Sequence, residues 1–260
     1  RAEGIAIPFR HANGSPIMSA SQDMVMGIYY LTVGHAGEPG EREKGKERAF
    51  ASPQEAMLAH TMGRIGMHTP IWVRTNRAQV VDGKDKLPEP VPANGRLVTT
   101  VGRCIFNDTL PAEMPFYNYP LGKAISRVVA DCHAQLGRGE TIDLLDRIKS
   151  MGFRYSTLAG LSFALTDLRI PAAKQKILDQ SQKKVDRVEK YHQDGAITPM
   201  ERHNQLIDIW VHAREQITDE MMKTLKMDWR DNQGHEAKPG DAHAKPYLNP
   251  IYLMTDSGAR

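Results

Sequence analysis

Two residues of this chain have side chains that suit an anionic ligand. Arg260 follows residues 256–259, and its guanidinium fork matches the oxygens of a phosphate group. Gln22 follows a turn at an expected helix start, where polar side chains and free backbone N–H groups meet anions. The alternatives are an ordinary surface arginine and a surface glutamine at a helix end. Asp23 is expected to stabilise the helix N-terminus rather than to do chemistry.

Other residue types that carry catalysis or bind metals lack the spacing that those roles need. Cys104 and Cys132 are isolated and are expected to be buried thiols. The sequence contains no Gly-rich phosphate loop, Ser-His-Asp set, CxxC pair or Asp-x-Asp-x-Asp string. The ten histidines show no zinc-ligand spacing with the cysteines, including the pairs His60/His68, His203/His212 and His235/His243. We therefore predict no catalytic residue and no metal site in this chain.

The composition is that of an ordinary globular protein, with 40% hydrophobic and 25% charged residues. The length of 260 residues permits one large domain or two modest ones. A formal net charge of +3 is weak support for nucleic-acid binding by the chain alone. No apolar run approaches the ~20 residues of a membrane span, and the N-terminus lacks a signal-peptide layout. We therefore expect a cytoplasmic protein without a membrane partner.

Turn signals and apolar periodicity divide the first part of the chain into short helices and strands. The expected helices cover 22–32, capped by Ser21, then 53–64, 122–136 and 141–151, the last one ended by Gly152. The expected strands cover 71–74 and 97–106. Three polar stretches are expected to be loops, at 34–48, 82–95 and 230–246.

The region after Pro171 predicts a pair of long helices. The first runs to Gly195, and Thr198 and Glu201 then form a capping box that starts the second. Residues spaced three and four apart form a narrow stripe on each helix: Leu178, Ser181, Val185, Val188 and His192, then Leu206, Trp210, Ala213 and Ile217. Such stripes, joined by a short turn, predict an antiparallel coiled-coil hairpin with arms of ~30 Å. Trp210 is interpreted as a packing anchor.

Several short strings resemble the largest subunit of bacterial RNA polymerase, the β′ subunit, and occur in the same order as in that family. They are NGSPI (13–17), SQD (21–23), GIYYLT (27–32), HTPI (68–71), TTVGR (99–103), FYN (116–118), GFRY (152–155), DIW (208–210) and PIYLMTDSGAR (250–260). One such string would be weak, but six or more in order are very specific. The resemblance covers nearly all 260 residues.

The resemblance implies that the chain is an internal fragment of β′, between the active-site aspartate loop and the bridge helix. The implied fold is α+β. A mixed pore (secondary-channel) domain of short strands and helices covers 1–168. A helical funnel domain with a projecting antiparallel coiled-coil hairpin at 171–218 covers 169–260. The implied function is DNA-directed RNA synthesis from nucleoside triphosphates, which enter through the secondary channel that this segment lines. Catalytic Mg²⁺ is held upstream, so the isolated fragment is expected to be inactive.

The resemblance also assigns binding residues. In the family, the arginine that matches Arg260 contacts the incoming triphosphate, and the position of Gln22 lies near the substrate. Four hairpin residues resemble positions that meet transcript-cleavage and secondary-channel factors: Glu201, Arg202, Asn204 and Asp208. In some bacteria guanosine tetraphosphate also binds there. An ordinary solvated helix face is the alternative.

The sequence departs from the family pattern near both predicted sites. Thr255 stands where the family usually has alanine, which puts local packing in question but not the arginine. His203 and Gln205 replace the usual tyrosine and lysine. The lost cation weakens the case for an anionic regulator, whereas factor docking is less affected.

The implied partners are the β, α, ω and sigma subunits, with template DNA and RNA in the assembled enzyme, at a cytoplasmic, nucleoid-associated location. A different class of function is a free-standing coiled-coil module that binds proteins and has no catalytic activity. A third is nucleic-acid binding by the isolated piece, which predicts a steep salt dependence of the affinity. The small net charge argues against the third.

Overall fold

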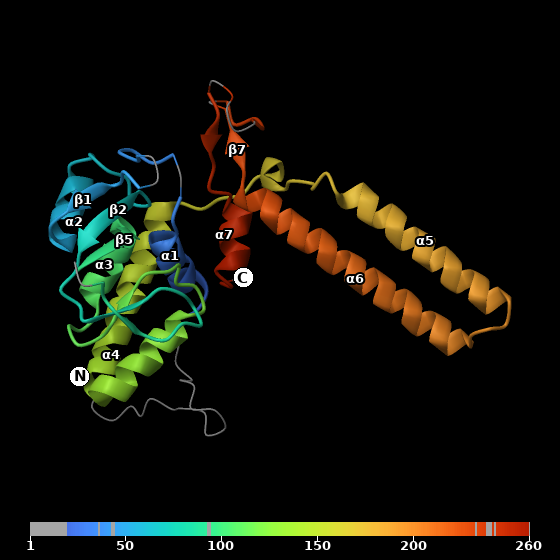
Figure 1. Cartoon of the computed structure of the whole chain (residues 1–260), viewed down its shortest axis with the longest axis horizontal. Helices are drawn as coiled ribbons and strands as arrows, with labels where there is room; N and C mark the ends of the chain where they lie inside the picture. Colours follow the sequence, from blue (N-terminus) through green and yellow to red (C-terminus); the bar gives the residue numbers. More distant parts are fainter. Residues whose placement is uncertain are drawn as a thin grey trace. The chain divides into compact units, whose positions relative to one another are not determined.

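A computed structural model gives the fold of the chain (Figure 1). It describes residues 20–259 apart from 36, 43–44, 93–94, 232, 238–240 and 242. Two compact units are present: Arg1–Ser162 together with Leu253–Arg260, and Phe163–Tyr252. The described residues form seven α-helices and several short strands, which confirms the predicted α+β class. None of these helices combines the length and hydropathy needed to cross a lipid bilayer.

Two three-stranded sheets lie in the first unit. One has the order β1-β2-β5 (Arg48–Phe50, Pro70–Arg74, Arg96–Thr100), with β1 parallel and β5 antiparallel to β2. The other has the order β4-β3-β6 (Glu89–Pro90, Gln79–Val81, Phe116–Tyr117). The strand predicted at 71–74 is confirmed as β2, whose alternate residues Ile71 and Val73 are buried.

The first two helices begin close to where their sequence signals predict. Helix α1 (Gln22–Thr32) has the predicted bounds, although Ser21 at its N-cap position makes no side-chain cap hydrogen bond. Helix α2 (Pro53–Thr61) follows Ser52, whose hydroxyl accepts the backbone N–H of Glu55 at 3.2 Å. Proline suits the first turn of α2 because its missing N–H would have no partner in the helix.

The strand predicted across 97–106 is wrong beyond Thr100. The chain enters α3 (Val101–Thr109) there, because Thr100 Oγ1 accepts the backbone N–H of Arg103 at 3.4 Å and caps the helix. The β-branched residues at 98–101 favour a strand locally. Close packing overrides that preference, since a Cβ atom at Gly102 would overlap the carbonyl oxygen of Leu31 in α1.

Two helices that the sequence predicted separately are joined in α4 (Ile125–Ala159). The break between them is Gly137, with φ 77°, a left-handed conformation that glycine adopts without strain. Gly152 does not end the second helix, contrary to the prediction; Gly160, with φ 54°, does. Gly152 lies instead at the contact with α1, where a Cβ atom on Gly27 would overlap its carbonyl oxygen.

Two clusters of buried side chains form the core of the first unit. The larger joins α1, α3, α4 and β6, and its members include Ile28, Leu31, Phe106, Tyr117, Val128 and Leu144. The smaller lies among β2, β5, α2 and α3, and includes Ala56, Ile71, Val73, Val101 and Cys104. Both cysteines are buried and free, as predicted. Burying one large aliphatic or aromatic side chain stabilises a fold by roughly 1.5–3 kcal/mol.

Arg77 fixes the C-terminal end of α3 by a set of hydrogen bonds that the sequence does not reveal. Its guanidinium donates to the carbonyl oxygens of Asn107 and Leu110, both at 2.9 Å, of Met114 at 3.0 Å, and of Pro111. Asn107 lies in the last turn of α3 and Leu110 at its C-cap, where carbonyls lack a partner four residues on, whereas Pro111 and Met114 belong to the segment that follows the helix. Burial lowers the pKa of Arg77.

The second unit contains α5 (Lys174–Gln193) and α6 (Pro199–Lys226), which lie side by side and run in opposite directions (Figure 1). Gly195, with φ 72°, follows the end of α5 as predicted. The predicted capping box is confirmed. Thr198 Oγ1 accepts the N–H of Glu201 at 3.2 Å, and Glu201 Oε2 accepts the N–H of Thr198 at 2.8 Å.

The contact between α5 and α6 is narrow. Ser181, Val188 and Ala213 are buried, and all three lie on the predicted stripes. Trp210, interpreted from the sequence as a packing anchor, keeps 41% of its surface exposed. The hairpin therefore buries less apolar surface than the number of its stripe residues suggests.

A cluster of buried charges holds the remainder of the second unit. It connects the 3-10 helix η1 (Leu165–Asp167) to β7 (Trp229–Arg230), which pairs antiparallel with β8 (Lys245–Pro246). Arg230 contacts Asp167 at 2.6 Å and Asp228 at 2.9 Å. The guanidinium carbon of Arg230 also lies 3.7 Å from the centroid of the Tyr247 ring. Helix α7 (Pro250–Asp256) follows.

Candidate functional site

Gln22 occupies the first position of α1 in an unusual backbone conformation. Its φ of 45° lies in the left-handed region, where it is the one non-glycine residue among those that the structure describes. Its side chain is exposed. Such a conformation costs roughly 1 kcal/mol or more, and residues of this kind cluster at ligand sites. The Ser21 side chain makes no cap hydrogen bond, so it does not accept from the backbone N–H groups of the first turn.

The segment that precedes Arg260 is held against the start of α4 within the first unit. The Tyr29 hydroxyl donates to Asp256, and the backbone N–H of Lys123 donates to the Ser257 carbonyl at 3.2 Å. A Cβ atom at Gly122 would come within 2.5 Å of that same carbonyl oxygen, so the two backbones are in close contact. Arg260 itself lies outside the described residues.

A cavity of about 470 Å³ adjoins this segment. Lys84 and Lys123 both line it, together with residues 255–258, which include Asp256. Tyr119 also reaches this cavity, and burial raises the pKa of its hydroxyl. Two ammonium groups in one cavity wall form a setting in which an anion can be bound.

Two of the four predicted factor-binding residues have structural partners in the hairpin. Glu201 completes the capping box, and its bonds to Thr198 lower the pKa of its carboxyl group. Arg202 joins α6 to α5 through two hydrogen bonds to Glu189, at 2.8 and 2.6 Å. These two side chains hold the tip of the hairpin in shape, so their loss would alter any docking surface indirectly.

Asn204 and Asp208 have a different setting. Both are exposed on α6 and are four residues apart, which places them on one face of the helix. Neither has a hydrogen-bond or ion-pair partner within the described part of the chain. Their polar groups are therefore available to a partner.

Two apolar residues on the same face were missed by the sequence analysis. Ile207 and Val211 lie three and seven residues after Asn204 and are both exposed. A face that mixes exposed apolar and unpaired polar side chains suits docking to a protein. Their three- and four-residue spacing is visible in the sequence, but they are not among the stripe residues predicted for the seam between the two helices.

The described residues hold no group of three or more histidine, cysteine, aspartate or glutamate side chains that could bind a metal ion. Gln22 and the 255–258 segment belong to the first unit, and the hairpin residues belong to the second. The structure therefore presents two separate candidate sites, one for an anion and one for a protein.

Comparison with known proteins gives the family. The model described as RNA polymerase Rpb1, domain 3, matches residues 9–168, and the one described as domain 4 matches residues 197–260. Proteins named DNA-directed RNA polymerase subunit beta' are similar to this chain. The one from Rhodopirellula baltica is 39% identical over 254 residues, and the one from Pelotomaculum thermopropionicum is 37% identical over 249.

These alignments cover 97% and 95% of this chain but 16% and 18% of the two relatives. A third relative, from Aquifex aeolicus, is 35% identical over 250 residues, which are 96% of this chain and 14% of that protein. The chain thus spans less than a fifth of the length of these relatives. With domain 3 matched across 9–168, this chain belongs to the RNA polymerase Rpb1 family.

Proposed function

We propose that this chain acts as part of the β′ subunit of a DNA-directed RNA polymerase, in the transcription of DNA into RNA. The observation that carries the proposal is the similarity to subunits of that name over 95–97% of the chain. We assign 1–168 to the pore domain and 169–260 to the funnel domain, with its coiled-coil hairpin at 171–218. Together they would line the secondary channel through which nucleoside triphosphates enter.

Arg260 and Gln22 would contact the triphosphate. Nucleotidyl transfer depends mainly on positioning and on neutralising phosphate charge, which cationic side chains supply. The cavity beside residues 255–258, with Lys84 and Lys123 in its wall, supports an anion-binding role for this region. The close contact of that segment with Gly122 and Lys123 would fix the direction in which the chain leaves toward Arg260.

The Mg²⁺ that such a reaction needs would be held elsewhere in the subunit. The described residues offer no metal-ligating group of three or more side chains, so they do not fit that role. In a polymerase the metal ions neutralise the phosphates and position the attacking oxygen. We therefore expect this chain alone to be inactive and to contribute to substrate entry and regulation.

The exposed face of the hairpin would bind proteins. Asn204 and Asp208 offer unpaired polar groups, with Ile207 and Val211 as apolar contacts, while Glu201 and Arg202 keep the tip in shape. The partners would be transcript-cleavage factors and other secondary-channel factors. The assembled enzyme would include the β, α, ω and sigma subunits and would act on DNA at the nucleoid.

Substitution of Arg260 tests the proposal. In an assembled polymerase, Arg260→Ala should raise the apparent KM for nucleoside triphosphates by on the order of tenfold or more, because a charge-assisted contact to phosphate is lost. Template binding should survive. Arg187→Ala, on the exposed surface of α5, is the control and should behave as wild type. Unchanged kcat and KM in Arg260→Ala would refute the assignment of this residue.

A further inference from the structure

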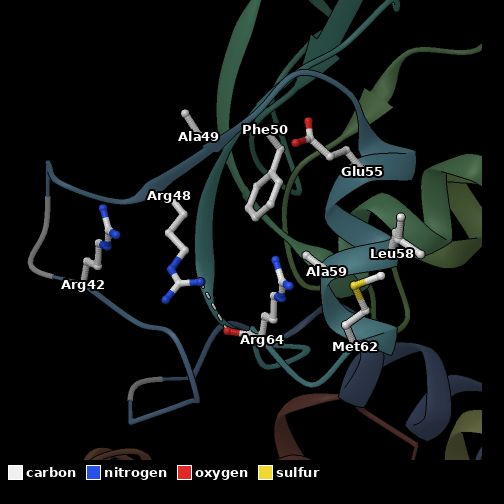
Figure 2. Close-up of a pocket in the computed structure, with 9 residues that line it drawn as sticks. All are labelled: Arg42, Arg48, Ala49, Phe50, Glu55, Leu58, Ala59, Met62 and Arg64. Carbon is white, nitrogen blue, oxygen red and sulfur yellow. Dashed lines mark hydrogen bonds between the residues drawn. The ribbon is translucent and has the colours of Figure 1, made fainter.

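A groove of about 650 Å³ is lined by residues of β1 and of α2 (Figure 2). All three residues of this strand, Arg48, Ala49 and Phe50, line the groove. Successive side chains of a strand point to opposite faces, and Arg48 and Phe50 are accordingly directed to one side of β1 while Ala49 is directed to the other (Figure 2). β1 pairs with β2 on one side, and no strand of the described chain pairs with its other side.

The groove is positively charged. Arg42, Arg48 and Arg64 line it, and none of the three forms an ion pair with a residue that the structure describes. Arg48 makes one long contact, from Nη1 to the carbonyl oxygen of Arg64 at 3.5 Å, and its buried Nε has no partner among the described residues. Glu55 accepts the backbone N–H of Ala51 at 2.6 Å and points away from the guanidinium groups (Figure 2).

The wall opposite β1 is apolar. Leu58 of α2 and Met62, the C-cap residue of that helix, lie four residues apart and keep 56% and 59% of their surfaces exposed. Ala59 of α2 belongs to the same wall, and Phe50 of β1 adds an aromatic side chain from the other side. Exposed apolar side chains next to unpaired guanidinium groups form a surface that complements a segment carrying both carboxylates and apolar side chains.

We propose that this groove binds an extended, acidic segment of a partner protein, which adds a strand to the free edge of β1. Backbone N–H and C=O groups of β1 would pair with those of the segment. Carboxylates on the face of the segment that meets the groove would reach Arg48 and Arg64. Apolar side chains two residues away on the same face of the segment would pack against Phe50, Leu58 and Met62, because Arg48 and Phe50 point to one face of the sheet. The inference does not rest on the proposed polymerase function.

A nucleic-acid strand fits the groove less well. Its sugar–phosphate backbone cannot continue a β-sheet, and single strands bind through stacking on several aromatic side chains. Phe50 is the sole aromatic residue among those that line the groove. The free edge and the aliphatic wall therefore favour a peptide.

Fluorescence anisotropy tests the charge requirement on the full chain, with a labelled peptide that carries glutamate and leucine in turn at every second position and serine between them. Arg48→Glu and Arg64→Glu should each weaken binding by about fivefold or more, as expected for reversing one partner of a half-exposed ion pair. Arg187→Glu makes the same change of net charge on α5 and should leave the affinity within about twofold. Met62→Glu, at an exposed position, should weaken binding without risk to the fold.

The same peptide tests the strand pairing. Methylation of alternate backbone nitrogens of the peptide should abolish binding on one of the two registers, and bound peptide should protect β1 amides from hydrogen exchange. Equal binding of a lysine–leucine peptide, tighter binding of an oligothymidine that competes with the acidic peptide, or indifference to methylation on both registers would each overturn the proposal. Absence of any binding would overturn it as well.

Discussion

The first unit and the α5–α6 hairpin are stabilised in different ways. In the first unit, α1 and α4 approach until the backbones touch at Gly27 and Gly152, and two clusters of side chains are buried around them. In the hairpin, the seam buries little more than Ser181, Val188 and Ala213. In the first unit, therefore, the size of the buried side chains limits which residues are tolerated. In the hairpin, the residues at the helix ends and a few charged pairs matter most.

This difference has a functional consequence. The hairpin is held by its capping box and by the Arg202–Glu189 pair. Most of its surface residues therefore contribute little to its stability. Residues such as Asn204 and Asp208 can then serve a partner without a cost in stability. In the first unit, the outer side of β1 has no strand partner within the described part of the chain.

The largest expected effect is at the helix contact of the first unit. Gly27→Ala should lower the free energy of unfolding by about 3 kcal/mol or more, because the new methyl group meets backbone atoms that cannot move aside. Gly139→Ala is the matched control, since a Cβ atom there meets nothing within 4 Å. It should stabilise α4 by about 0.5–1 kcal/mol. Urea unfolding of both variants measures the contrast, and equal stabilities would refute the close contact.

A second effect should depend on pH through His68. Burial lowers the pKa of this side chain to about 4, despite its hydrogen bond to the Val33 carbonyl at 3.0 Å. The unfolded chain, with a histidine pKa near 6.5, binds the proton first as the pH falls. Stability is therefore complete above about pH 6.5 and declines by up to ~3 kcal/mol towards pH 4.

Urea unfolding of wild type and His68→Asn between pH 7 and pH 4 measures the contribution of His68 to the pH dependence of stability. The variant removes the titrating group while all other groups stay in place, so its stability should change less over this range. Parallel curves for the two proteins would show that His68 is not buried in its neutral form.

The hairpin should respond more weakly to a change at its cap. Thr198→Ala removes the acceptor for the Glu201 N–H and should cost about 1 kcal/mol. Thr198→Ser keeps the oxygen and should cost less. Thermal unfolding followed by circular dichroism compares the two variants. If Thr198→Ala lowered the stability as much as Gly27→Ala, the hairpin would not depend less on any single residue than the first unit does, which would contradict the comparison.

The smallest expected effect on stability is at Asp208. Asp208→Ala removes an exposed carboxylate without a partner in the described chain and should change the free energy of unfolding by less than ~0.5 kcal/mol. In an assembled polymerase it should nevertheless reduce factor-stimulated transcript cleavage and leave plain elongation intact. Normal stimulated cleavage in this variant would remove Asp208 from the docking face.

Local signals in the sequence were sufficient for α1, α2 and the capping box at Thr198, because turn residues and apolar spacing agree there. They failed at Val101. The β-branched residues there favour a strand, but the helix cap at Thr100 and the close contact of Gly102 with Leu31 select a helix. They failed again at Gly152, because a glycine needed for close packing looks the same as one that ends a helix.

The binding features divide in the same way. The polar face of α6 could be predicted from residue types and helical spacing, and the resemblance to a family gave it a role. The four carbonyls gathered by Arg77 and the charged groove beside β1 could not be predicted. Both depend on residues distant in sequence, such as Arg42 and Met62, that only the fold brings together.

Purification through a tag tests the central proposal most directly. An affinity tag placed after Gly195, in the turn between α5 and α6, should leave both helices intact. If the chain acts within β′, the purified material should contain the β, α and ω subunits in fixed proportion and should incorporate nucleotides on a DNA template. Recovery of the chain with other proteins but without those subunits or that activity would contradict the proposal and favour a free-standing interaction module.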